Sequence, residues 1–105
     1  EAVVRAIAEL LTRDPGLKLH VVVHSDDAKP ATASLDLTRK RAAAVTHLLT
    51  RQHRIPSARV SPAGLGPLAP VASNRTVEGR ARNRRVELVP NEVTVGREAA
   101  ASVRR

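Results

Sequence analysis

The stretch "LKLHVVVHSDDAKPATASLDLTRKRAAAVTHLL", residues 17–49, has the pattern of a strand that leads through an acidic loop into a helix. Apolar and polar residues alternate over residues 17–23, which predicts a strand with one strongly buried face. A proline-containing loop is expected over residues 24–34. Apolar residues then recur at helical spacing, which predicts a helix from about residue 36 to residue 53. This strand–loop–helix unit is the framework to which the other segments are added.

Helical and strand patterns also alternate in the rest of the chain. Asp36 or Thr38 is expected to cap the long helix. Pro62 is expected at a sheet edge or a bulge, because proline cannot donate to a ladder. The remaining expected elements are a helix over residues 1–13, a strand over 58–64, a helical turn within 75–83 and a strand over 84–90.

Helices interleaved with strands predict a two-layer α/β sandwich, with the helices on one face of a small mixed sheet. We expect one domain over residues 1–90 and a C-terminal extension over residues 91–105. Three strands make a thin sheet for two helices. Either a further strand precedes residue 1, or "EVTV" at residues 92–95 fills an edge.

The composition limits the possible functions. The chain has 105 residues and no cysteine, which excludes disulfides, thiolate zinc sites and cysteine nucleophiles. It has no Phe, Tyr, Trp or Met, so its core must be aliphatic. Its net charge of +8 favours a polyanionic partner such as nucleic acid, acidic lipid or an anionic cell wall. The lack of aromatic stacking platforms weighs against single-strand binding, whereas contact with duplex phosphates stays open as an alternative. We expect no cofactor, no metal site, no membrane-spanning segment and no signal peptide.

Opposite charges are expected to meet at one rim of the sheet. Asp26 follows the first predicted strand, and Arg41 lies about one turn into the following helix, on the apolar stripe of Leu37, Val45 and Leu48. A carboxylate facing a guanidinium and a helix N-terminus suits a zwitterionic ligand. The alternative is an ion pair that only closes the loop onto the helix.

Five blocks follow one another along the chain: "VHSD" at 23–26, "SLDLTRKRAAAVTHLL" at 34–49, "GLG" at 64–66, "PVASN" at 70–74 and "EGRARNRRVELV" at 78–89. In their order and spacing these blocks resemble the OmpA-like C-terminal domain, which is shared by OmpA, the peptidoglycan-associated lipoprotein and the flagellar stator protein MotB.

This resemblance implies a βαβαβ-type fold whose first strand lies before residue 1. It implies a periplasmic, cell-envelope domain that is not an enzyme and binds peptidoglycan through the diaminopimelate of the stem peptide. Asp26 would take the ammonium, Arg41 the carboxylate, and Arg84 would line the same pocket. The backbone of residues 35–37 would donate N–H groups. The full set of expected site residues is Asp26, Arg41, Arg84, Ser34, Leu37 and His24, with His24 orienting the loop by a hydrogen bond.

Two departures from the family pattern support a rival interpretation. Val23 stands where the family has glycine, and Ser34 stands where it has asparagine. The rival is a family member that has lost ligand binding and acts as a structural or interaction unit. A basic nucleic-acid-binding domain is the other alternative, although we expect no nucleic acid partner. The oligomeric state is left open. We expect Arg80 to hold its turn together, whereas Arg75, Arg82 and Arg85 are expected to be solvated or paired with Glu78 or Glu87.

Overall fold

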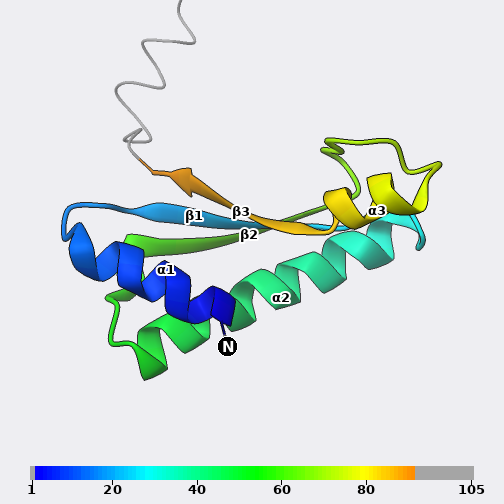
Figure 1. The fold of residues 1–105 in the computed structure, drawn as a ribbon. Helices are drawn as coiled ribbons and strands as arrows, with labels where there is room; N and C mark the ends of the chain where they lie inside the picture. The colour runs from blue at the N-terminus through cyan, green and yellow to red at the C-terminus, as the bar shows by residue number, and fades with distance from the viewer. Residues whose placement is uncertain (1, 92–105) are drawn as a thin grey trace, which may run out of the picture.

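The structure is a computed structural model that describes residues 2–91. Helices and strands alternate as the sequence predicts, and the two-layer α/β arrangement is confirmed (Figure 1). The predicted edge strand at residues 92–95 lies outside the described residues. The elements are α1 (Ala2–Arg13), β1 (Leu19–His24), α2 (Ala31–Gln52), the 3₁₀ helix η1 (Ser57–Arg59), β2 (Val60–Gly66), α3 (Val77–Asn83) and β3 (Arg85–Pro90).

The described part of the chain forms a mixed three-stranded sheet of order β2-β1-β3. β1 is parallel to β2 and antiparallel to β3. Pro62 therefore lies in an edge strand, as expected. His24 pairs with Arg85, so the loop after β1 lies beside the residue that precedes β3. This register brings Asp26 close to Arg84, although the two are 58 residues apart in the chain.

Both long helices pack on the same face of the sheet, and α3 lies at the end where β1 ends and α2 begins (Figure 1). We call this end the α3 end. The core is aliphatic, as the composition requires, and Leu11, Val21 and Leu49 are fully buried in it. Because β1 supplies alternate residues to the core, Val23 faces the helices and His24 faces the opposite side of the sheet.

The second helix begins earlier than the sequence pattern indicated. α2 starts at Ala31 and not near Asp36, so the expectation that Asp36 or Thr38 caps it is wrong. Pro30 occupies the cap position, with φ −54° and ψ 144° and no capping side chain. Proline suits the start of a helix because its missing N–H would have no partner there. The Thr38 hydroxyl instead donates to the Ser34 carbonyl at 2.9 Å, inside the helix.

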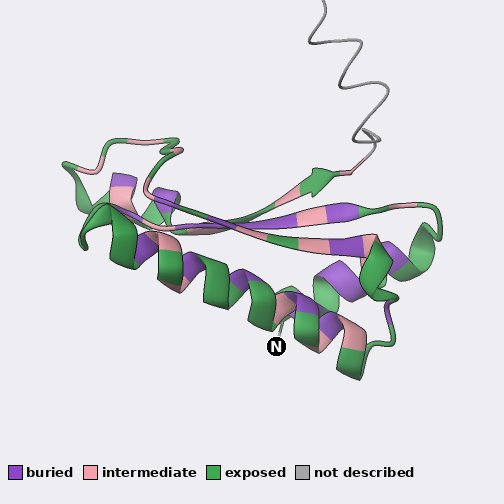
Figure 2. Ribbon diagram, turned by 180° about the vertical axis from the view of Figure 1, so that it is seen from behind, coloured by how far each residue is buried: buried purple, intermediate pink, exposed green. Residues whose placement is uncertain are grey.

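The buried stripe of α2 also differs from the apolar stripe read from the sequence. Gly64 of β2 lies so close that a Cβ there would sit 2.2 Å from the Arg39 backbone nitrogen. Only small side chains fit against such a close strand, and the Thr38 hydroxyl accepts the Gly66 N–H at 3.0 Å. Figure 2 shows buried positions recurring along α2. These positions are Ser34, Thr38, Ala42, Thr46 and Leu49, whereas Leu37, Val45 and Leu48 are half-buried at the border.

Candidate functional site

The Asp26 carboxylate lies at the α3 end and is largely buried, with 8% of the residue exposed. One oxygen accepts the Ala28 N–H at 2.9 Å. The other accepts a hydrogen bond from the Arg84 guanidinium in an ion pair. The Ala28 hydrogen bond, followed by the Arg84 hydrogen bond, holds the pKa of Asp26 below its ordinary value. Asp26 is therefore an ionised, oriented carboxylate.

The pair sits at the surface and not in the core. The Arg84 side chain is 53% exposed, whereas the Asp26 side chain is 12% exposed. The guanidinium thus reaches over the carboxylate from the solvent side. A small cationic group that approached Asp26 would meet Arg84 beside it.

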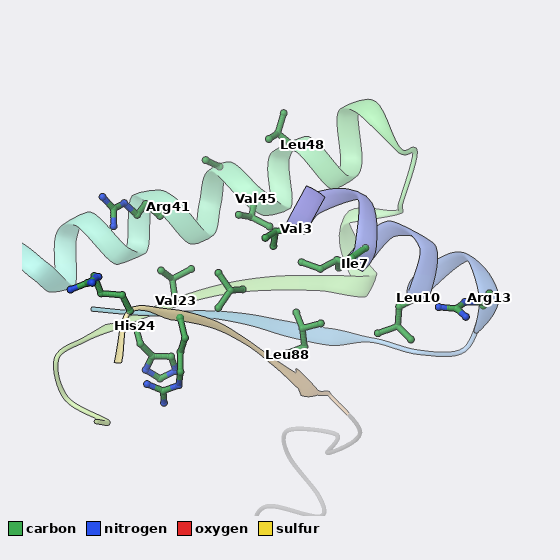
Figure 3. Close-up of a pocket in the computed structure, with 15 residues that line it drawn as sticks. Val3, Ile7, Leu10, Arg13, Val23, His24, Arg41, Val45, Leu48 and Leu88 are labelled. Carbon is green, nitrogen blue, oxygen red and sulfur yellow. The ribbon is translucent and has the colours of Figure 1, made fainter. Parts of the chain in front are cut away.

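Arg41 lies on the helix side of the sheet and projects from α2 near Val45 (Figure 3). It lines a groove of about 960 Å³ that also includes Val23 and Arg84. Within residues 2–91, the Arg41 side chain makes no hydrogen bond or ion pair, and the guanidinium paired with Asp26 is that of Arg84. The structure therefore joins Asp26 directly to Arg84, and Arg84 shares the groove with Arg41.

Most of the remaining lining is apolar, and the groove runs between α1, α2 and β3. The apolar residues that line it are Val3, Ala6, Ile7, Leu10, Ala44, Val45, Leu48, Val86 and Leu88. Val86 and Leu88 both face it, as the alternation in the last strand predicts. Arg41 and Arg84 lie toward the α3 end of the groove, Arg85 also lines it, and Arg13 lies at its other end (Figure 3).

His24 is also among the residues that line the groove. Its ring lies on the other side of the strands from Arg41 (Figure 3). The residue is only 3% exposed, and its Nε2 lies 2.8 Å from Oε1 of Glu87. Its Nδ1 is buried and finds no partner in the described part of the chain. The ring hydrogen bond therefore goes to a side chain of β3 and not to the loop that His24 was expected to orient.

Ser34 and Leu37 lie inside α2 and not in a loop. Ser34 is 2% exposed and its N–H donates to the Pro30 carbonyl at 3.0 Å. Leu37 is half-buried. The expectation that residues 35–37 supply free backbone N–H groups is wrong, because those amides lie beyond the first turn and bond within the helix. The N–H groups without intrahelical acceptors are those of residues 31–33.

Asn83 has a structural role that sequence reasoning missed. It is fully buried. Its Oδ1 accepts the N–H groups of Val71 and Ala72 at 2.8 and 3.0 Å, and its Nδ2 donates to the Ala72 carbonyl and to Asn74. Arg80 adds a 2.9 Å hydrogen bond to the Asn74 carbonyl, which confirms its expected role in the turn. The loop before α3 is thus held by side chains that leave Arg84 free to reach Asp26.

The described residues include no group of three or more His, Cys, Asp or Glu side chains arranged to hold a metal ion. None of the helices within residues 2–91 has the length and apolar character needed to span a bilayer.

The chain is similar in sequence to several known proteins. It is 35% identical over 82 residues to the probable lipoprotein YiaD of Escherichia coli K12, covering 78% of this chain and 37% of YiaD. It is 32% identical over 89 residues to the peptidoglycan-binding protein ArfA of Mycobacterium tuberculosis, covering 85% of this chain and 27% of ArfA. The chain therefore spans less than half the length of either relative.

A solved structure shows the same fold. The peptidoglycan-associated lipoprotein from Burkholderia pseudomallei matches with a TM-score of 0.75 and 28% identity, covering 86% of this chain and 75% of that one. A family model matches residues 1–84, which include Asp26, Arg41 and Arg84. This chain belongs to the OmpA family.

Proposed function

We propose that this domain binds peptidoglycan non-covalently, through the diaminopimelate of the stem peptide, and so anchors an envelope protein to the cell wall. The names of two similar proteins support peptidoglycan as the ligand: ArfA is called peptidoglycan-binding, and the Burkholderia protein is called a peptidoglycan-associated lipoprotein. The domain would act by binding and not by catalysis, and its place would be the periplasmic side of the envelope.

The observation that carries the proposal is the pairing of charges at the α3 end of the groove. An ionised Asp26 lies beside Arg84, and Arg84 lines the same groove as Arg41. The free end of diaminopimelate carries an ammonium and a carboxylate on one carbon. Asp26 would accept the ammonium, and Arg41 would bind the carboxylate through paired N–H donors.

The Asp26 carboxylate keeps hydrogen-bond acceptor capacity for this ligand despite its internal partners. A carboxylate has roughly four acceptor positions, of which Ala28 and Arg84 occupy two. Arg84 also offers a second guanidinium near the ligand carboxylate. The uncapped start of α2 adds the N–H groups of residues 31–33 at the same end of the molecule.

Affinity per site is expected to be modest, because few groups converge on so small a head group. Firm attachment would come from many sites along the wall, or from several copies of the domain in an assembly. The net charge of +8 would assist the encounter with an anionic polymer.

Pull-down with purified sacculi tests the proposal. Diaminopimelate-type sacculi should retain the wild type, and free meso-diaminopimelate should release it. Asp26→Ala and Arg41→Ala should lose most of the retention. Arg51→Ala is the matched control, because Arg51 lies exposed in the last turn of α2 and does not line the groove. Retention of both site variants at the wild-type level would show that the pocket is wrongly assigned.

A further inference from the structure

A second polar cluster lies on the opposite side of the sheet, at the same end. The buried His24 ring contacts Glu87 at 2.8 Å, and Arg85 Nη2 lies 3.7 Å from the same Glu87 oxygen. Arg85 also donates to the Ala69 carbonyl at 3.0 Å and to the Asn83 carbonyl at 3.3 Å. Glu87 thus connects His24, the last residue of β1, with Arg85, the first residue of β3. Arg85 in turn joins them to the loop before α3.

This cluster adjoins the Asp26–Arg84 pair along the chain. His24 and Arg85 form the last pair of the antiparallel ladder, and Asp26 and Arg84 lie just beyond it. Past that point the Ser25 N–H still donates to the Gly66 carbonyl of β2 at 2.9 Å, but no backbone hydrogen bond in the described part of the chain joins the Asp26 segment to β3. The position of Asp26 relative to Arg84 therefore depends on how firmly the His24–Arg85 end of the sheet is held.

The His24 ring has one hydrogen bond to hold it in the described part of the chain. Its Nδ1 has no partner, so contact with Glu87 is the interaction that fixes the ring. A carboxylate accepts and cannot donate, which places the ring hydrogen on Nε2. Without Glu87, Nε2 would lose its acceptor while Nδ1 stays without a partner, and no hydrogen bond in the described part of the chain would fix the orientation of the ring.

We propose that Glu87 is a positioning residue for the ligand site: it fixes His24, and through His24 it holds the Asp26 carboxylate in its binding orientation. This inference rests on the proposed peptidoglycan binding for its effect on affinity. Its effect on Asp26 can be observed without any ligand, because the Ala28 N–H donates to the Asp26 carboxylate.

The test compares Glu87→Ala, Glu87→Gln and the control Glu78→Ala. The control removes an exposed carboxylate in the first turn of α3. Water exchange of the Ala28 amide, measured by NMR, should quicken in Glu87→Ala and stay unchanged in Glu78→Ala. Affinity for meso-diaminopimelate, measured by calorimetry, should fall about tenfold in Glu87→Ala. At metal sites, loss of a residue that hydrogen-bonds to a ligating histidine lowers affinity about tenfold to a hundredfold, and we expect the lower figure here. The glutamine amide oxygen still accepts from Nε2, so Glu87→Gln should restore both readouts.

Unchanged Ala28 exchange in Glu87→Ala would overturn the inference. So would faster exchange with an affinity within twofold of wild type, or a glutamine variant as impaired as the alanine one. A wild type that does not bind meso-diaminopimelate would refute the proposed function instead, and the exchange measurement would still decide whether Glu87 positions Asp26. Ring ¹⁵N shifts of His24 should show the Nε2–H form in wild type and lose that preference in Glu87→Ala.

Discussion

Replacing Gly64 by alanine should destabilise this domain through one contact, the approach of α2 to β2. A Cβ at position 64 would lie 2.2 Å from the Arg39 backbone nitrogen and 2.5 Å from the Thr38 carbonyl carbon. Ordinary van der Waals contact begins at 3.4 Å. Because both obstacles are backbone atoms of a helix, no side chain can rotate away, and α2 must move back by about 1 Å.

The cost can be estimated from known core substitutions. Overpacking typically costs about 1–3 kcal/mol, and a forced retreat of a whole helix belongs at the upper end. The same retreat would stretch the 3.0 Å hydrogen bond between the Gly66 N–H and the Thr38 hydroxyl. A loss of about 3 kcal/mol in a domain of this size lowers Tm by about 12–24 °C.

Thermal unfolding followed by far-UV circular dichroism suits a protein without aromatic residues. Gly16→Ala is the matched control, because the nearest atom to a Cβ there is the Asp14 side chain at 3.8 Å. The control should unfold within about 2 °C of the wild type, since ordinary contact costs little. A Gly64→Ala Tm equally close to the wild type would refute the packing argument.

Three further predictions concern individual polar groups. Asn83→Ala should lower the free energy of unfolding by about 3 kcal/mol in urea denaturation, because it leaves buried backbone groups of the loop before α3 without hydrogen-bond partners. An equal loss in the exposed control Arg82→Ala would contradict this explanation. Arg59 donates to three backbone carbonyls near the end of α1. Arg59→Ala should therefore lower the free energy of unfolding by about 1–3 kcal/mol, and Arg59→Lys should be equally unstable, because lysine lacks the planar guanidinium with its several N–H donors. Wild-type stability in Arg59→Lys would count against this explanation. The fold holds the pKa of Asp26 below its ordinary value of 3.8, so the stability this carboxylate provides is present above that pH and is lost as the pH falls through the lower folded value. Tm should therefore fall more steeply in acid for the wild type than for Asp26→Asn, and parallel curves would show that Asp26 makes no such contribution.

The order of elements was predictable because burial patterns are local. Alternation over a few residues identified β1 and β3, and helical spacing identified α1. The start of α2 was not predictable in this way. Residues 31–34 are small and weakly patterned, and residues 31–33 are exposed, so burial leaves no periodic signal at the start of the helix.

The buried face of α2 escaped prediction for a related reason. Sequence reasoning assigns apolar residues to the core, yet Ser34 and Thr38 are more deeply buried than Leu37. Gly64 lets the strand approach the helix backbone, so small size matters more there than hydrophobicity. The Thr38 hydroxyl offsets its burial by hydrogen-bonding to backbone groups.

By itself, the sequence determined the alternation of helices and strands, the aliphatic core and the presence of charged side chains near one rim of the sheet. Only the tertiary structure decided that Asp26 pairs with Arg84, that Arg41 lines the groove without an internal partner in the described part of the chain, and that His24 faces the other side. The physical reason is register. Periodicity is a property of neighbouring residues, whereas the meeting of Asp26 and Arg84 depends on which strands are adjacent and which residues face each other across them.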